Sequence, residues 1–137
     1  MNFIKLDSQD QPLQADAPEW ASVLDTQTNL IWDKEHQPKR LTHAQAEQLV
    51  AGRSDGRRLP TLQELESIRD ITRCNPAIDT EVFPGTPSAW FRTSSPFVGA
   101  AGYSWFVSFN GGLSDFILHG LGAFVRLVRS APSVPGQ

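Results

Sequence analysis

The sequence predicts an α+β domain in which two short helices support a small twisted antiparallel sheet. In the C-terminal third, short runs of aromatic and β-branched residues flank a Gly-rich turn, which is the pattern of paired strands. Near the middle of the chain, two capping signatures each precede apolar residues at helical spacing. Because the strand and helix patterns are grouped rather than alternating, the order differs from that of βαβ units.

Length and composition limit the classes of function. With 137 residues, the chain has room for one domain with an ordinary core. No apolar run approaches the ~20 residues that a membrane helix needs, so we expect no membrane partner. The net charge of −3 argues against general binding to nucleic-acid phosphates, and nucleic acid is therefore not an expected partner.

The single cysteine, Cys74, excludes an intramolecular disulfide and any multi-cysteine metal site. One free thiol fits a reducing compartment. The first residues lack the charged and apolar regions of a secretory signal. We therefore expect a cytoplasmic location, unless a leader has been removed.

The domain boundaries follow from composition. Residues 1–19 are polar and acidic and include two prolines, which predicts an extended arm; its few apolar residues, Phe3, Ile4 and Leu6, would let it dock as an edge strand. The domain itself is expected over residues 20–130. Residues 131–137, with two further prolines, are expected to form a flexible tail.

The first half of the domain contains one hairpin pattern and two helix patterns. Val23-Leu24 and Leu30-Ile31-Trp32 flank a polar stretch of the kind that forms a hairpin loop. Residues 42–45 have the capping-box pattern and predict a helix that continues to Gly52. Residues 61–64 repeat this pattern with Thr61 as N-cap and Glu64 at N3, and predict a second helix that ends near residues 69–72.

A proline-rich connection and four strands make up the second half. The connection from Pro76 to Pro87 needs apolar anchors, for which Ile78, Val82 and Phe83 are suited. The predicted strands are residues 89–94, 103–109, 113–118 and 123–129. Asn110-Gly111-Gly112 joins the middle two, because Asn and Gly tolerate the positive φ of tight turns.

A two-residue loop at Gly111-Gly112 fixes a register for this hairpin. Phe109 would then face Ser114, Val107 would face Phe116, and Trp105 would face Leu118. This register predicts a buried face made of Trp105, Val107, Phe109, Phe116 and Leu118.

Six stretches in order carry a family resemblance. They are Leu30-Ile31-Trp32-Asp33, Arg58-Leu59-Pro60-Thr61 with Glu64-Leu65, Asn75-Pro76-Ala77-Ile78-Asp79 with Phe83-Pro84, Trp90-Phe91 with Thr93-Ser94-Ser95, Trp105-Phe106-Val107 with Phe109 and Gly111-Gly112, and Val125-Arg126-Leu127-Val128-Arg129. From about Trp20 to Arg129, they resemble the successive signatures of the Lcl C-terminal domain family, which comprises bacterial and phage modules of unknown function.

The resemblance implies a C-type-lectin-like fold of the formylglycine-generating-enzyme type. Diversity-generating retroelements use this fold for hypervariable binding proteins. In such relatives, the C-terminal hairpin and the loops beside it present the side chains that contact the ligand.

The sequence lacks the residues on which relatives with this fold depend for catalysis or calcium binding. Formylglycine-type catalysis uses two cysteines, and this chain has only Cys74. The Glu-Pro-Asn tripeptide of calcium-dependent lectins is missing, and His36, His43 and His119 lack the spacing of a metal pair. We therefore expect no enzyme activity, no catalytic residue, no metal and no cofactor.

A ligand surface is predicted on the C-terminal hairpin and the strand before it. Aromatic and Arg side chains give large contact areas, and Ser, Asn and Asp add hydrogen bonds. Since the register above assigns Trp105 and Phe116 to the core, the predicted ligand-binding residues are Trp90, Arg92, Tyr103, Ser108, Asn110, Asp115 and His119.

Two charged sets have structural interpretations. Arg126 lies in an apolar strand and requires a partner, for which Glu64 or Glu66 of the second helix is the nearest by family architecture, so we predict a buried ion pair of Arg126 with Glu64. The basic residues Arg53, Arg57 and Arg58, with Lys39 and Arg40, form either a solvated loop or a patch for an acidic partner. The net negative charge favours the solvated loop.

Three functions remain open. The favoured one is a noncatalytic recognition domain that binds a protein, or alternatively a glycan, through the C-terminal hairpin face. The second is a small phage- or mobile-element-encoded inhibitor that docks on a host protein and blocks it. The third is an enzyme with an unrecognised site.

Overall fold

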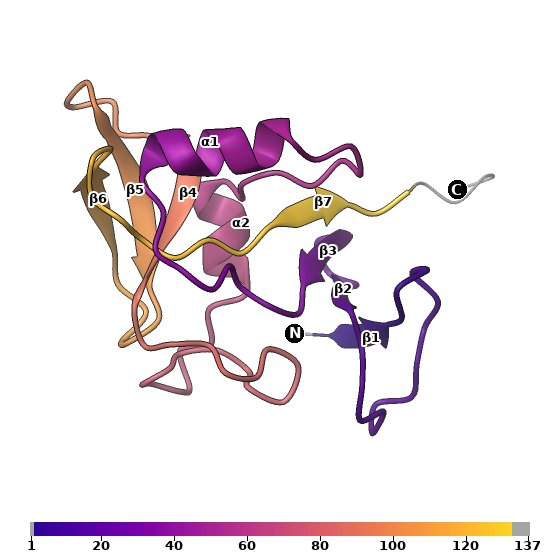
Figure 1. The fold of residues 1–137 in the computed structure, drawn as a ribbon. Helices are drawn as coiled ribbons and strands as arrows, with labels where there is room; N and C mark the ends of the chain where they lie inside the picture. Colours follow the sequence, from indigo (N-terminus) through magenta and orange to yellow (C-terminus); the bar gives the residue numbers. More distant parts are fainter. Residues whose placement is uncertain (1, 133–137) are drawn as a thin grey trace.

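Two antiparallel sheets and two short helices form the α+β fold in the computed structural model, which describes residues 2–132 (Figure 1). One sheet has four strands in the order β1-β2-β3-β7, and the other has three in the order β4-β5-β6. The predicted α+β class is thus confirmed, with two sheets where one was expected. Of the predicted flexible tail, residues 133–137 lie outside the described residues.

The four-stranded sheet is built on the predicted first hairpin. β2 (Ser22–Asp25) pairs with β3 (Leu30–Asp33), and Asn29 supplies a positive φ of 59° in the loop between them. The N-terminal arm docks as the edge strand β1 (Phe3–Leu6), antiparallel to β2. The apolar residues of the arm are what allow this docking, since Leu6 is buried.

The fourth predicted strand, residues 123–129, does not belong to the C-terminal sheet. Ala123 and Phe124 form only isolated bridges, and β7 (Val128–Ser130) pairs with β3 instead. The reason is that this stretch is apolar on both sides. Its residues 125 and 127 pack against α1, while Val128 lies in the main core, so the segment crosses from one sheet to the other (Figure 1).

Both helices begin where the capping boxes predict. α1 (His43–Ala51) has Thr42 as its N-cap, and α2 (Leu62–Ser67) has Thr61, each with the reciprocal side-chain and backbone hydrogen bonds. α2 ends earlier than residues 69–72. After it, the Asp70 N–H donates to the carbonyl of Ala77 at 2.8 Å, so the chain turns instead of continuing the helix.

The C-terminal sheet contains β4 (Trp90–Pro96), β5 (Tyr103–Ser108) and β6 (Ser114–Leu118). The predicted register of its hairpin is wrong by two residues. Trp105 lies opposite Phe116, and Val107 lies opposite Ser114.

Phe109 explains this difference in register. Its side chain is 1% exposed in the core, and its N–H donates to the carbonyl of Ala89 at 3.0 Å. Phe109 therefore leaves the β5–β6 ladder and enters the loop. The Ser108 N–H then bonds to the Leu113 carbonyl at 2.7 Å, which makes residues 109–112 a four-residue loop, and Gly112 provides its positive φ of 86°.

One core is shared by both sheets and α2. It includes Trp32 and Val128 of the first sheet, Phe91 and Val107 of the second, and Leu65 of α2. The proline-rich connection is anchored in this core by Ile78, Val82 and Phe83, as predicted from the sequence. The two sheets are therefore packed on common neighbours rather than on separate cores.

The predicted ion pair of Arg126 with Glu64 does not occur. Arg126 is 1% exposed, but its Nη1 donates to the carbonyls of Asp33 (2.9 Å) and Lys34, and its Nη2 donates to Thr86 Oγ1 (2.8 Å). Burial lowers the pKa of Arg126 to about 10.

Glu64 is held elsewhere. Its capping bond to the Thr61 N–H keeps it at the start of α2, where Arg58 donates to both carboxylate oxygens at 2.6 and 2.8 Å. This two-point contact lowers the pKa of Glu64, with burial opposing it. The capping role therefore keeps Glu64 away from the buried strand that carries Arg126.

Candidate functional site

The residues predicted to bind a ligand do not form one surface. Arg92 is 0% exposed, and it donates through Nε to the carbonyl of Leu41 and through Nη2 to that of Leu121. Ser108 is 8% exposed, and its Oγ accepts the Asn110 N–H in the hairpin loop. Both residues were predicted to face a ligand, and both are instead buried with polar atoms bonded within the chain, although Arg92 Nη1 has no hydrogen-bond partner among the described residues.

An aromatic cluster occupies one face at the open end of the β5–β6 hairpin. Phe97 stacks on Phe116 with ring centroids 4.2 Å apart, and Trp105 meets the edge of Phe97 at 5.4 Å. Tyr103 contacts Phe116 edge-on at 5.7 Å. We call these four residues the aromatic cluster. Tyr103 is thus the predicted site residue that lies in it.

The aromatic cluster is partly open to solvent. Phe116 is 43% exposed, while Trp105 is half-buried, so their assignment to the core was wrong. The two-residue shift in register moves Phe116 beside Trp105 and away from α2. Two further apolar side chains on nearby chain segments are exposed, Leu118 at 44% and Val98 at 97%. Exposed apolar side chains gathered in this way are typical of an interaction surface.

The loop between β4 and β5 completes the aromatic cluster. The β4–β5 register shifts between Arg92 and Pro96, and the loop then closes with a bond from the Phe97 N–H to the Tyr103 carbonyl at 3.0 Å. Thr93 Oγ1 donates to the Trp105 carbonyl at 2.7 Å and holds the two strands together. Phe97 is therefore positioned by main-chain geometry on both sides of the loop.

Trp90 lies on the opposite face of the same sheet. It is 48% exposed, and its ring stacks on Phe106 at 4.5 Å. It borders a hollow of about 390 Å³ whose other lining residues are Arg40, Ser88, Ala89, Leu121 and Gly122. Trp90 and Tyr103 therefore belong to different faces, since residues of β5 alternate between them.

His119, which follows β6, contacts His43 at the start of α1. Its ring stacks on that of His43 with centroids 3.8 Å apart, and its Nε2 lies 2.8 Å from Ser104 Oγ. The His43 N–H donates to the His119 carbonyl at 2.9 Å. Burial, and next the charge of His43, lower the pKa of His119. These contacts give His119 a structural role.

Asn110 and Asp115 are exposed, but they lie apart from Tyr103 along the sequence of the hairpin. Asn110 is in the loop, where its carbonyl accepts the Asn75 N–H at 2.7 Å. Asp115 is in the middle of β6, and its Oδ1 accepts the Phe116 N–H at 2.8 Å. Asp115 is thus an exposed charged residue that immediately precedes Phe116 of the aromatic cluster in the sequence.

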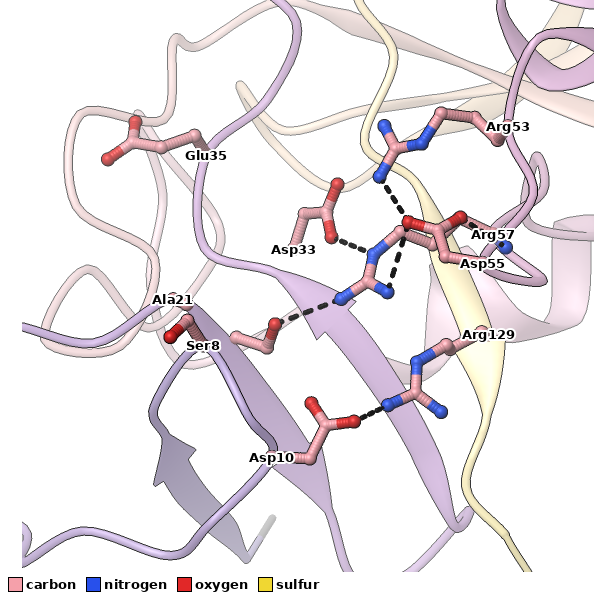
Figure 2. A pocket seen from close by; sticks show the side chains of 10 residues that line it. Ser8, Asp10, Ala21, Asp33, Glu35, Arg53, Asp55, Arg57 and Arg129 are labelled. Carbon is pink, nitrogen blue, oxygen red and sulfur yellow. Dashed lines mark hydrogen bonds and ion pairs between the residues drawn. The ribbon is translucent and has the colours of Figure 1, made fainter.

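A second concavity, of about 600 Å³, is lined by charged residues (Figure 2). Arg57 donates to Asp33 Oδ1 at 2.5 Å and to Ser22 Oγ at 3.1 Å, and Arg53 donates to Asp55 at 2.7 Å. On the other side of the pocket, Arg129 pairs with Asp10. The hydrogen bond between Arg53 and Asp55 raises the pKa of Arg53 and lowers the pKa of Asp55.

This pocket adds ion pairs to the basic loop. The loop is solvated as predicted, since residues 54–56 are exposed, but Arg53 and Arg57 are each paired with a carboxylate. Asp55 lies two residues from both, so the Arg-Ser-Asp-Gly-Arg spacing was the signal for this pairing. Acidic and basic side chains alternate around the pocket, which leaves no surface of one sign for a phosphate backbone.

The model of the Lcl C-terminal domain family matches residues 21–129. The chain belongs to this family. The search of curated proteins and the search of solved structures each gave no match. The C-type-lectin-like assignment of this Lcl C-terminal domain therefore stays a prediction, while its family and its α+β class are established.

Two further features of residues 2–132 concern membranes and metals. In the part of the chain that the structure describes, no helix is long and apolar enough to cross a bilayer. Within residues 2–132, no three His, Cys, Asp or Glu side chains are grouped so that they could hold a metal ion.

Sequence reasoning missed Phe97, Trp105 and Phe116 as candidate site residues. Phe97 lies in a loop with no motif of its own. The other two were assigned to the core because they share a face with Val107, but that face is buried at Val107 and partly open at Trp105 and Phe116. The aromatic content of the region was the available signal. It showed that a large apolar area was present, but not which side faced solvent.

Proposed function

We propose that this Lcl C-terminal domain is a noncatalytic recognition domain that binds a protein partner through the aromatic cluster. The observation that carries the proposal is the exposure of Phe116 (43%) within a stack of ordered rings. Aromatic side chains dominate the energetics of protein interfaces because they bury large areas and lose few rotamers.

The packing of the cluster favours tight recognition. Phe97 and Tyr103 both contact Phe116, which limits the motions of its ring before any partner arrives. Binding then costs less side-chain entropy than it would for an isolated exposed ring. The charged pocket supports the same choice, because its side chains are engaged with one another.

A photo-crosslinking amino acid in place of Phe116 would identify the partner in cells that encode the domain. The dissociation constant of the purified complex would then be measured for Phe116→Ser and for the control Leu113→Ser. Leu113 is 66% exposed and outside the aromatic cluster. We expect Phe116→Ser to weaken binding by about 10-fold or more, in the range of interface hot spots, and the control to leave it within about twofold. Equal losses in both variants would refute the proposal.

The same complex tests the narrower role of an inhibitor. A domain that docks on a host protein to block it would abolish that protein's activity at stoichiometric amounts, and Phe116→Ser would relieve the block. A domain that only recognises its partner would leave the activity unchanged.

Glycan binding is the second candidate, and Trp90 is the observation that favours it. An exposed indole ring beside Arg40 and Ser88 offers a stacking platform with polar neighbours. A glycan array probed with the domain and with Trp90→Ala would show whether the domain binds a glycan through Trp90. Binding that is lost in Trp90→Ala but kept in Phe116→Ser would favour the glycan over the protein partner.

A further inference from the structure

β6 presents an open sheet edge, whereas the outer sides of β1, β4 and β7 each bond in part to other segments of the chain. The outer side of β4 bonds to Phe124, with the Arg92 N–H on the Phe124 carbonyl at 2.8 Å and the Phe124 N–H on the Trp90 carbonyl at 3.0 Å. The outer side of β7 bonds to Arg58 through Val128. β6 pairs with β5 and has no strand on its other side among residues 2–132 (Figure 1).

The ladder shows which main-chain groups point outward from β6. At its two ends, the Leu113 carbonyl and the His119 N–H bond to the β5 side, at 2.7 and 2.8 Å. Hydrogen bonds alternate along an antiparallel pair, so residues 113, 115, 117 and 119 face β5. The main-chain groups of Ser114, Phe116 and Leu118 therefore face outward. The Leu118 carbonyl already accepts the Leu121 N–H at 3.1 Å, in the turn that follows β6. The other outward groups of this row form a template for another strand.

Three side chains distinguish this edge from a merely unpaired one. Phe116 and Leu118 share the face of the aromatic cluster, and they are 43% and 44% exposed. On the other face, Asp115 carries a negative charge, and its Oδ1 covers the outward N–H of Phe116. A natural edge is often protected by a charged side chain. Here, a basic residue on an arriving strand would pair with Asp115 and release that N–H.

We propose that β6 captures an extended segment of a partner protein as a fourth, antiparallel strand of this sheet. The inference rests on the proposed function, because the same aromatic cluster supplies the apolar contacts. Antiparallel pairing is the rule for the strand pairs of both sheets. Strand addition gains affinity from main-chain hydrogen bonds and specificity from alternate side chains.

The register defines the captured sequence. One residue of the segment lies opposite Phe116, and the residue two positions before it lies opposite Leu118, so both are apolar and face the aromatic cluster. The residue that follows lies opposite Asp115 and is Lys or Arg. The recognised pattern is therefore apolar, any, apolar, basic.

A second copy of the domain fits this edge less well. Twofold pairing of β6 about Phe116 would set each Asp115 opposite Ile117 of the other copy, with the two carboxylates diagonal on one face at roughly 7–8 Å. The net charge of −3 on each chain adds to this repulsion. Charge complementarity therefore selects a basic segment over another β6.

A phage-displayed library of random short peptides, selected on the purified domain, tests the pattern directly. We expect the enriched peptides to share the apolar, any, apolar, basic order. A synthetic copy of the best peptide should lose about 10-fold in affinity when the residue opposite Phe116 is N-methylated. Replacing its basic residue with Ala should cost about threefold with the native domain and nothing with Asp115→Asn, whose amide oxygen still accepts the Phe116 N–H. Failure of enrichment, a different pattern, or indifference to N-methylation would each overturn the inference.

A matched pair of variants tests the edge itself. Leu118→Pro and Leu118→Ala remove the same apolar side chain, but only proline removes the outward N–H and places a ring on the edge. We expect Leu118→Pro to bind the peptide about 10-fold more weakly than Leu118→Ala, with matching circular dichroism. If Leu118→Pro does not fold, the N-methylated peptide alone decides.

The outcomes separate this inference from the proposed function. If peptide binding is weakened by Phe116→Ser but not by N-methylation of the peptide, the aromatic cluster is a binding surface and strand addition is refuted. Peptides unaffected by Phe116→Ser would refute both. Concentration-dependent dimers in sedimentation, abolished by Leu118→Pro, would assign the edge to a second copy and overturn the inference.

Discussion

Two buried guanidinium groups in this domain donate mainly to main-chain carbonyls, and Arg92 Nη1 has no partner among the described residues. Arg126 donates to the carbonyls of Asp33 and Lys34, and Arg92 donates to those of Leu41 and Leu121. A carbonyl acceptor has no signature in the sequence, because every residue carries one. The burial of Arg126 was therefore predictable from its apolar neighbours, whereas its partners were not.

Replacement of Arg126 by Met should destabilise the domain strongly. Met fills much of the same volume, but the Thr86 hydroxyl and the two carbonyls lose their donor. Buried acceptors without partners cost about 1–3 kcal/mol each, so we expect the free energy of unfolding in urea to fall by about 2–5 kcal/mol. Arg73→Met is the control at an exposed position and should change stability by less than about 0.5 kcal/mol. A small effect in both variants would show that the buried contacts are not stabilising.

Acid should destabilise the domain through His119. In the folded chain, its pKa is lowered from 6.5 by burial and next by the charge of His43. Between the folded and unfolded pKa values, the unfolded chain binds more protons, so stability is complete above about pH 6.5 and decreases as the pH falls below it. The pKa of His36 is also lowered, by burial and the charge of Arg126, and acts in the same direction.

Urea unfolding at a series of pH values would measure this effect. We expect the free energy of unfolding to decrease from about pH 7 to about pH 5, with a smaller decrease for His119→Gln, which removes one of the two groups. The same slope in both proteins would show that His119 does not contribute to the pH dependence.

At the scale of elements, the success of prediction depended on how far apart the deciding residues lie. The capping boxes at Thr42 and Thr61 involve residues only three apart, and the structure contains both. The hairpin register was set by the burial of Phe109 against distant residues such as Phe91, which no local pattern encodes. A shift of two residues keeps every side chain on its face, so alternation alone could not detect the error.

The cap at Thr61 gives a test of the element that supports β4 and β5. Thr61 Oγ1 accepts the Glu64 N–H at 3.2 Å, and α2 places Leu65 in the core. We expect Thr61→Ala to lower the free energy of unfolding by about 1 kcal/mol, and Thr61→Ser to restore most of it because serine also caps helices. Equal losses in the two variants would indicate that the threonine methyl group, rather than the cap, is important.

At the scale of the whole molecule, the segment from Ala123 to Ser130 connects the two sheets. Its Phe124 bridges to Phe91 of β4, and its end then pairs as β7 with β3. Expecting one sheet was reasonable from the sequence, because both halves of this segment have the same strand-like pattern. Which strand it joins depends on both sheets being formed, and this information is spread over the chain.

The shared core and this connecting segment predict that the two sheets unfold together. Val128 is 0% exposed and contacts the main core, whereas Ser130 on the same strand is exposed. Val128→Asp would bury a charge without a partner, and we expect it to lower the free energy of unfolding by about 3 kcal/mol or more, with little change for Ser130→Asp. Fluorotryptophan incorporated into one and the same protein would give separate fluorine NMR signals for Trp32 of β3 and Trp105 of β5, which report on each sheet separately. Their urea transitions should coincide, and Val128→Asp should shift both equally. Separate midpoints, or a shift at Trp32 alone, would show that β7 stabilises only its own sheet and that the hairpin carrying the aromatic cluster folds independently of it.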